Sequence, residues 1–222
     1  MKKAFLFASI FFSIVACKKG DTEVSYSNPV ISVTASMDTV WYNGNSIISW
    51  SATNASAISV SNGIGSVALS GSFTTPALTQ STTYTFSVTG PTGKKTSKAI
   101  RIYVHSERTT LLCNYGQWHL TYLAAKNVDS TNWVIYPTTS FCDTYQFLPN
   151  NIGIDTHGPC SVEPGRQFQY SWSFKSNETE MEWGQVWTID TLNTRKLQRS
   201  RINEDIFTPG IFYNAVEAYE HP

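Results

Sequence analysis

The chain has 222 residues, and its 16 Lys and Arg residues are balanced by 16 Asp and Glu residues. This balance excludes the strongly basic footprint of a nucleic-acid binder, so we expect no nucleic-acid partner. Short runs rich in Val, Ile, Thr, Tyr and Trp alternate with turn residues along the whole chain. That composition predicts an all-β protein with one large domain or two small ones.

The N-terminus has the pattern of a cleaved export signal. Lys2 and Lys3 precede an apolar run over 4–16, which at about 20 Å as a helix is too short for the ~30 Å core of a membrane. The run ends in Ile-Val-Ala-Cys at 14–17, which resembles the lipobox of bacterial lipoproteins. That resemblance implies cleavage before Cys17 and di- or triacylation of this residue. The alternative is an ordinary signal peptide in which the cysteine falls at this position by chance.

An acylated Cys17 would attach the protein firmly to a bilayer, because stable anchoring needs more than one acyl chain. We therefore expect a lipid-anchored protein of the cell envelope, whose membrane contact is this N-terminal anchor. The lipobox pattern favours the outer membrane of a Gram-negative bacterium, and leaves open whether the protein faces the periplasm or the cell surface.

The region that follows is almost free of charge, since Asp38 is the only charged residue between positions 24 and 93. Catalysis by general acids, bases or nucleophiles needs titratable groups beside suitable partners, so we expect no active site here. Apolar residues alternate with small polar ones in this region. The alternation predicts strands at 30–35, 46–52, 57–61, 66–71, 83–90 and 98–104.

The placing of Gly44, Trp50 and Pro76 around these strands, with the run TTYTF at 82–86, resembles a bacterial immunoglobulin-like domain. The resemblance implies a β-sandwich, here without the cysteine pair that such domains often carry. We expect this domain to be a spacer that holds the rest of the chain away from the membrane.

The second half of the chain contains eight further predicted strands, at 116–124, 144–148, 152–156, 166–175, 180–183, 185–192, 196–202 and 211–219. The triplet Gly-Gln-Trp at 116–118, followed by CDTYQF and YSWSF, resembles the lipocalins and in particular the small lipocalin-like domains of bacterial surface lipoproteins. The resemblance implies an eight-stranded antiparallel barrel, either filled with side chains or holding one small ligand. It also implies that Arg199 or Arg201 packs over Trp118.

The strongest alternation in the chain lies in RQFQYSWSFK, where four aromatic residues share one face of a strand: Phe168, Tyr170, Trp172 and Phe174. Gln and Ser residues occupy the opposite face. The aromatic face is therefore expected to be buried inside the barrel. Together with Trp118 these rings either fill the interior or line a pocket for an apolar or ring-shaped ligand, and both interpretations stay open.

The cysteines test the expectation of export. Cys142 precedes the strand at 144–148 and Cys160 follows the strand at 152–156, so pairing the two strands as a hairpin brings the cysteines together. We expect them to form a disulfide, as exported proteins can. Cys113 is then left over, and we expect a buried thiol rather than a nucleophile.

Metal and catalytic sites are not expected. Asp155 and His157, with Cys160 three positions on, combine metal-ligating residue types, but they lack a second ligand pair and would use a cysteine of the expected disulfide. The chain contains no HExxH, GxSxG or P-loop pattern. We therefore expect no metal, no cofactor and no enzymatic activity.

These observations divide the chain near 104–110 and predict a signal peptide over 1–16, a tether over 17–28, an immunoglobulin-like sandwich over 29–105 and a lipocalin-like barrel over 108–222. We expect a non-catalytic envelope lipoprotein whose barrel binds a small apolar ligand. The alternative is a protein or glycan interaction module of a surface assembly, with a filled barrel and a surface protein as partner. An aromatic-lined pocket favours the first function, whereas an exposed apolar patch over a filled barrel favours the second.

Overall fold

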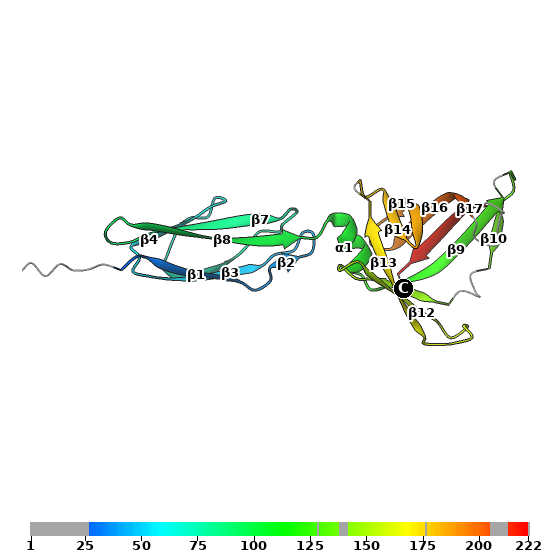
Figure 1. The fold of residues 1–222 in the computed structure, drawn as a ribbon, viewed down its shortest axis with the longest axis horizontal. Helices are drawn as coiled ribbons and strands as arrows, with labels where there is room; N and C mark the ends of the chain where they lie inside the picture. The colour runs from blue at the N-terminus through cyan, green and yellow to red at the C-terminus, as the bar shows by residue number, and fades with distance from the viewer. Residues whose placement is uncertain (1–26, 128, 138–141, 176, 205–212, 222) are drawn as a thin grey trace, which may run out of the picture.

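A computed structural model describes residues 27–127, 129–137, 142–175, 177–204 and 213–221. The expected signal peptide and Cys17 lie outside these residues. The fold is all-β, with two sheets over residues 30–104 and one closed sheet over residues 117–220, joined through a short helix (Figure 1). The predicted fold class, a sandwich followed by an eight-stranded antiparallel barrel, is confirmed. Among the described residues, no helix has both the length and the apolar character to cross a membrane.

The sandwich contains the strands β1 (Val30–Ala35), β2 (Thr39–Val40), β3 (Ile47–Thr53), β4 (Ala57–Val60), β5 (Gly65–Val67), β6 (Ser70–Thr74), β7 (Thr82–Thr89) and β8 (Lys95–Val104). Its two sheets have the orders β1-β3-β6 and β2-β8-β7-β4-β5. The strand predicted at 66–71 is divided in the structure, because the chain leaves β4 after β5 and joins β3 as β6. The two-residue strand β2 was too short to predict.

The sandwich core forms where the alternating apolar faces of the two sheets meet. Ile48, Phe86 and Ile102 are fully buried, and Trp50 lies among them. Trp50 also lies against Gly71 on the neighbouring strand, where an added Cβ would be 3.0 Å from the indole. Aromatic and aliphatic packing thus stabilises this domain without a disulfide.

The barrel follows a single helix, α1 (Glu107–Cys113), and contains β9 (Gln117–Asn127), β10 (Val134–Tyr136), β11 (Thr144–Phe147), β12 (Ile152–Thr156), β13 (Gln167–Phe174), β14 (Glu180–Trp183), β15 (Gln185–Leu192), β16 (Lys196–Glu204) and β17 (Tyr213–Glu220). Eight of these strands run in the order β9-β11-β12-β13-β14-β15-β16-β17, and β17 pairs with β9 to close the sheet. All neighbours are antiparallel. Each predicted strand of the barrel has its counterpart here.

Two elements were not predicted, and both adjoin β9. The short strand β10 pairs with Leu123–Ala125 of β9, while β11 pairs with Gln117–His119 on the same edge of that strand. The helix α1 begins after Ser106, whose hydroxyl accepts a hydrogen bond from the Thr109 N–H, as an N-cap does. The sequence analysis had treated this segment as a polar junction.

Helix α1 covers one end of the barrel and also contacts the sandwich. Leu112 is fully buried, and its carbonyl accepts a hydrogen bond from the Trp118 indole N–H at 2.9 Å. On the other side, the Thr110 hydroxyl accepts from the Tyr42 N–H at 3.0 Å, and Trp41 packs against the barrel core. The helix therefore belongs to the barrel, with a small contact to the end of the sandwich.

Candidate functional site

The pairing register of the barrel identifies which side chains point inward. Cross-strand partners share a face of a sheet, and Tyr145 is paired with both Trp118 and Asp155, which is paired in turn with Phe168. The same register, followed around the barrel, places further side chains on this inner face: Phe147, Tyr170, Trp172, Phe174, Met181, Trp183, Trp187, Ile189, Leu197, Arg199, Arg201, Glu217 and Tyr219.

All five predicted ligand-contacting residues belong to the inner face, but they differ in burial. Trp118 and Trp172 are buried, and Tyr170 and Phe174 are half-buried against the same core cluster. Phe168, at the start of β13, is 39% exposed and contacts the His157 ring, with the two ring planes tilted by 48°. The aromatic face of β13 thus runs from a solvent-exposed rim into the core.

The end of the barrel beside α1 is filled with apolar side chains. Phe147, Met181 and Leu197 are fully buried there together with Trp118. The Trp172 indole N–H donates to the Leu148 and Ile152 carbonyls, each at 3.1 Å, so this ring is fixed in the wall. This part of the interior is a packed core.

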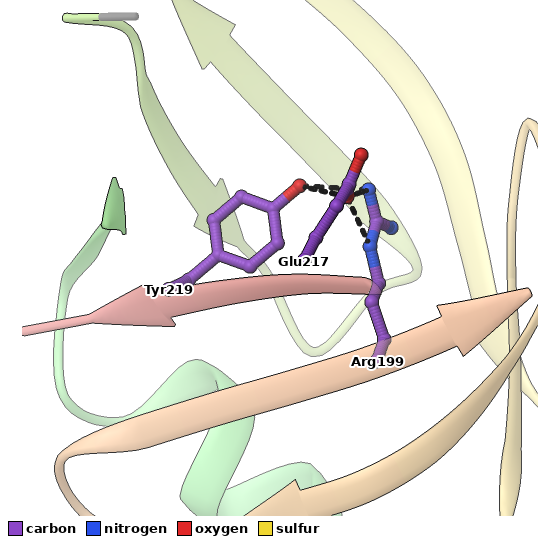
Figure 2. Close-up of polar contacts among 3 residues, drawn as sticks. All are labelled: Arg199, Glu217 and Tyr219. Carbon is purple, nitrogen blue, oxygen red and sulfur yellow. Dashed lines mark hydrogen bonds and ion pairs between the residues drawn. The ribbon is translucent and has the colours of Figure 1, made fainter. Parts of the chain in front are cut away.

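Farther from α1, the inner face carries a buried polar cluster formed by Arg199, Glu217 and Tyr219. Figure 2 shows Arg199 on β16 and the other two on the neighbouring strand β17, with their polar groups converging. One Glu217 oxygen accepts from Arg199 Nε at 2.8 Å, from Nη2 at 2.5 Å and from the Tyr219 hydroxyl at 2.6 Å. Burial raises the pKa of Tyr219, so its hydroxyl stays protonated and remains a donor.

The guanidinium of Arg199 is also enclosed by aromatic rings. Its central carbon lies 3.8 Å from the ring centre of Trp183 and 3.9 Å from that of Trp187. The expected packing of Arg199 or Arg201 over Trp118 is therefore wrong, since Arg201 also lies over Trp187, at 4.8 Å. The ring that faces Trp118 is His221, at 3.8 Å, because Trp118 lies at the filled end of the barrel.

Some polar atoms of the inner face are buried without a hydrogen-bond partner among the residues that the structure describes. They include Nη1 of Arg199, the hydroxyl oxygen of Tyr170 and Oδ1 of Asp155. The pKa of Tyr170 is raised by burial and by the Asp155 carboxylate, while Arg199 acts in the opposite direction, so the three groups interact electrostatically. Buried polar groups nearly always have a hydrogen-bond partner, so several unpaired polar atoms on one inner face are unusual.

An acidic grouping lies at the rim of the barrel, where Asp143, Asp155 and His157 place ligand-type atoms within 4.8 Å of one another. Burial raises the pKa of Asp155, Asp143 raises it further, and His157 lowers it. The sequence analysis had grouped Asp155 and His157 with Cys160, but the structure brings Asp143 to them instead. Asp143 lies beside His157 because Thr144 of β11 is paired with Thr156 of β12. This pairing brings the next positions outward, 143 and 157, opposite each other.

The cysteines lie as predicted. Cys142 and Cys160 form a disulfide with their Cα atoms 5.9 Å apart, which joins the two chain segments that flank β11 and β12. Cys113 is free and buried, and burial raises the pKa of its thiol to about 12. A thiol with that pKa carries almost no thiolate at neutral pH, so Cys113 is not suited to be a nucleophile.

A groove of about 500 Å³ crosses β13 between Asn151 and Gly184, and inner-face residues Tyr170 and Trp172 contribute to its wall. Ser171, Ser173 and Glu182 complete the lining. The groove therefore adjoins two of the residues that the sequence analysis associated with ligand binding.

The sequence analysis did not single out Trp183, Trp187 or Glu217 as site residues. Trp187 lies two positions before Ile189, and Glu217 lies two positions before Tyr219, so the two-residue period of a strand could have placed Trp187 and Glu217 on inner faces. No family model matches the chain, and no curated protein matches its sequence.

Proposed function

We propose that the protein is a non-catalytic lipoprotein of the cell envelope whose barrel binds one small, largely apolar ligand. The closed eight-stranded barrel is consistent with a lipocalin-like binding fold. In this proposal Cys17 carries the acyl anchor, the outer membrane is the site of attachment, and the immunoglobulin-like sandwich is the spacer.

The observation that carries the proposal is the contrast between the two ends of the inner face. Beside α1 the interior is packed with apolar side chains, as a purely structural barrel requires. Around Arg199 the aromatic rings surround buried polar atoms that no described protein group satisfies. A bound molecule with an apolar body and a polar group would satisfy them, which is the usual composition of a small-molecule site.

The proposal is tested with the mature chain, made soluble by Cys17→Ser, and the neutral fluorescent probe N-phenyl-1-naphthylamine. We expect saturable binding at a single site. Trp187→Leu, on the inner face, should weaken binding by roughly tenfold because it removes aromatic contact area. Val186→Ala is the matched control, since Val186 is the preceding residue of β15 and is 43% exposed. Absence of saturable binding, or an equal loss with both variants, would contradict the proposal.

The second candidate function, an interaction module of a surface assembly, is favoured by one exposed patch. Trp133, Val134 and Ile135, in and beside β10, are 44%, 53% and 65% exposed. Contiguous exposed apolar residues often mark a contact with another protein. If the probe does not bind the interior of the parent protein, this second function becomes the better one.

A further inference from the structure

Arg199 is enclosed on almost every side by its own protein. The residue is 5% exposed, its two faces contact the rings of Trp183 and Trp187, and its Nε and Nη2 atoms donate to Glu217. Nη2 also donates to the Tyr219 hydroxyl at 2.8 Å. The one nitrogen left without a partner among the described residues is Nη1.

Loss of a proton cannot remove the cost of burying this unpaired nitrogen, because an arginine side chain stays charged in proteins. Nη1 carries N–H donors only, so it requires an acceptor. The aromatic rings of Trp183 and Trp187 offer no acceptor oxygen, and the hydrogen bonds from Arg199 to Glu217 come from the other two nitrogens and go to one oxygen, Oε2. The position therefore calls for an acceptor that comes from outside the described chain.

A second unpaired donor belongs to Tyr170, whose ring contacts the same tryptophan, Trp183, as the Arg199 guanidinium does. The Tyr170 ring is stacked on Trp183, with ring centres 5.1 Å apart and planes 18° from parallel, and its hydroxyl has no partner among the described residues. Burial raises the pKa of this hydroxyl, so it stays protonated at neutral pH and can donate. Gly153 makes room for the ring, because a Cβ there would lie 1.9 Å from it.

We infer that the ligand of the barrel carries a carboxylate, which accepts hydrogen bonds from Arg199 Nη1 and the Tyr170 hydroxyl while the surrounding tryptophans hold its apolar body. This inference rests on the proposed function and specifies its ligand class. A charged acceptor suits Nη1 better than a neutral one, because charge-assisted hydrogen bonds are the stronger kind. A phosphate would bring more charge and more acceptors than these two donors can serve, close to two carboxylates, Glu217 beside Arg199 and Asp155 beside Tyr170.

The test compares two ligands of matched shape, 2-naphthylacetic acid and 2-(2-naphthyl)ethanol, by calorimetry on the mature chain carrying Cys17→Ser. We expect the acid to bind at least about tenfold more tightly than the alcohol. Tyr170→Phe should weaken binding of the acid severalfold and leave binding of the alcohol unchanged. This variant removes a hydroxyl without a partner, so it should fold as well as the parent.

A second variant tests the guanidinium directly. Arg199→Met combined with Glu217→Gln removes both charges together, so that no carboxylate is left buried and unpaired, and it should abolish the preference for the acid. Arg201→Met is the matched control two residues along the inner face of β16 and should keep the preference.

The outcomes separate the inference from the function on which it rests. If the parent protein binds the acid and the alcohol with equal affinity, the inference of a carboxylate ligand is wrong, while the proposal of ligand binding stands. A preference that survives the double variant, or that is lost with Arg201→Met alone, overturns the assignment to Arg199. If neither compound and no neutral probe binds, the proposed function fails, and the inference with it.

Discussion

Single residues decide how the interior of the barrel is divided between core and site. Gly153 has no side chain, and this allows the Tyr170 ring to lie across β12 toward Trp183. Arg199 then brings a charge into a region that would otherwise be apolar, and Glu217 compensates that charge through two hydrogen bonds. A buried pair of this kind is seldom the most stable filling for a core, which is consistent with a role in binding.

Trp172 is expected to be the main stabilising residue of β13. It is 3% exposed, its indole N–H donates to the carbonyls of Leu148 after β11 and Ile152 at the start of β12, and its ring packs edge-on against Phe147. Trp172→Ala should therefore lower the free energy of unfolding by about 3–5 kcal/mol, measured by denaturant titration. Phe168→Ala is the matched control on the same face of the same strand. Because Phe168 is 39% exposed, its truncation should cost less than about 1.5 kcal/mol. Similar losses for both variants would contradict this assignment.

At the scale of elements, β9 shows how a bulge redirects side chains. Leu120 pairs with Tyr219 and Tyr122 with Ala218, so Thr121 is an extra residue in the ladder. Trp118 and Leu120 face inward before the bulge, and Leu123 faces inward after it. An uninterrupted alternation would have put Tyr122 inside the barrel, where the structure has it 38% exposed.

The β11–β12 hairpin depends on its disulfide. The bond between Cys142 and Cys160 closes a loop with a sequence separation of 18. Replacing both cysteines by serine should lower the free energy of unfolding of the barrel by about 3 kcal/mol, because the unfolded chain regains the entropy of that loop. Denaturant titration with and without a reductant measures this loss. The reductant should destabilise the parent by a similar amount and leave the double variant unchanged; an unaffected parent would show that the bond does not stabilise the fold.

On the scale of the whole molecule, the sandwich and the barrel are separate sheets with few contacts between them. Trp41 packs against the barrel core and contacts the tilted His105 ring, and the Tyr42 N–H donates a hydrogen bond to Thr110 of α1. The barrel closes its sheet through β17 and β9 without any strand of the sandwich. Ligand binding and positioning at the envelope are thus assigned to different domains in the proposed function.

The proposed attachment of the protein to the membrane is tested at Cys17. If Cys17 carries the acyl anchor, Cys17→Ser should abolish fatty-acid labelling and move the protein from the membrane fraction to the soluble fraction. Cys113→Ser is the matched control, because Cys113 is the other cysteine outside the disulfide and is buried in the barrel. Labelling and fractionation that are unchanged in the Cys17 variant would exclude the lipid anchor.

The sequence alone determined most of the strands, the fold class and the disulfide, but not the short strands β2 and β10. Alternation is a local property of a chain segment, so runs such as QFQYSWSF indicate a strand and its buried face without reference to any partner. The disulfide followed from the same local evidence, because one hairpin carries both cysteines. The prediction of Trp172 as an inward-facing residue rested on this alternation, whereas Trp118 was included through the resemblance of Gly-Gln-Trp to lipocalins.

Only the tertiary structure decided which side chains meet on the inner face at each height along the barrel. The bulge in β9 is defined by its pairing with β17, which is distant in the sequence. The residues of β9 alone do not predict it. Arg199 contacts Trp183, Trp187 and Glu217 because four strands, β14 to β17, pair in register, whereas the family resemblance had predicted a contact with Trp118. Local alternation assigns a side chain to a face, but its neighbours on that face depend on pairing between distant segments. The physical reason is that strand register is a long-range property.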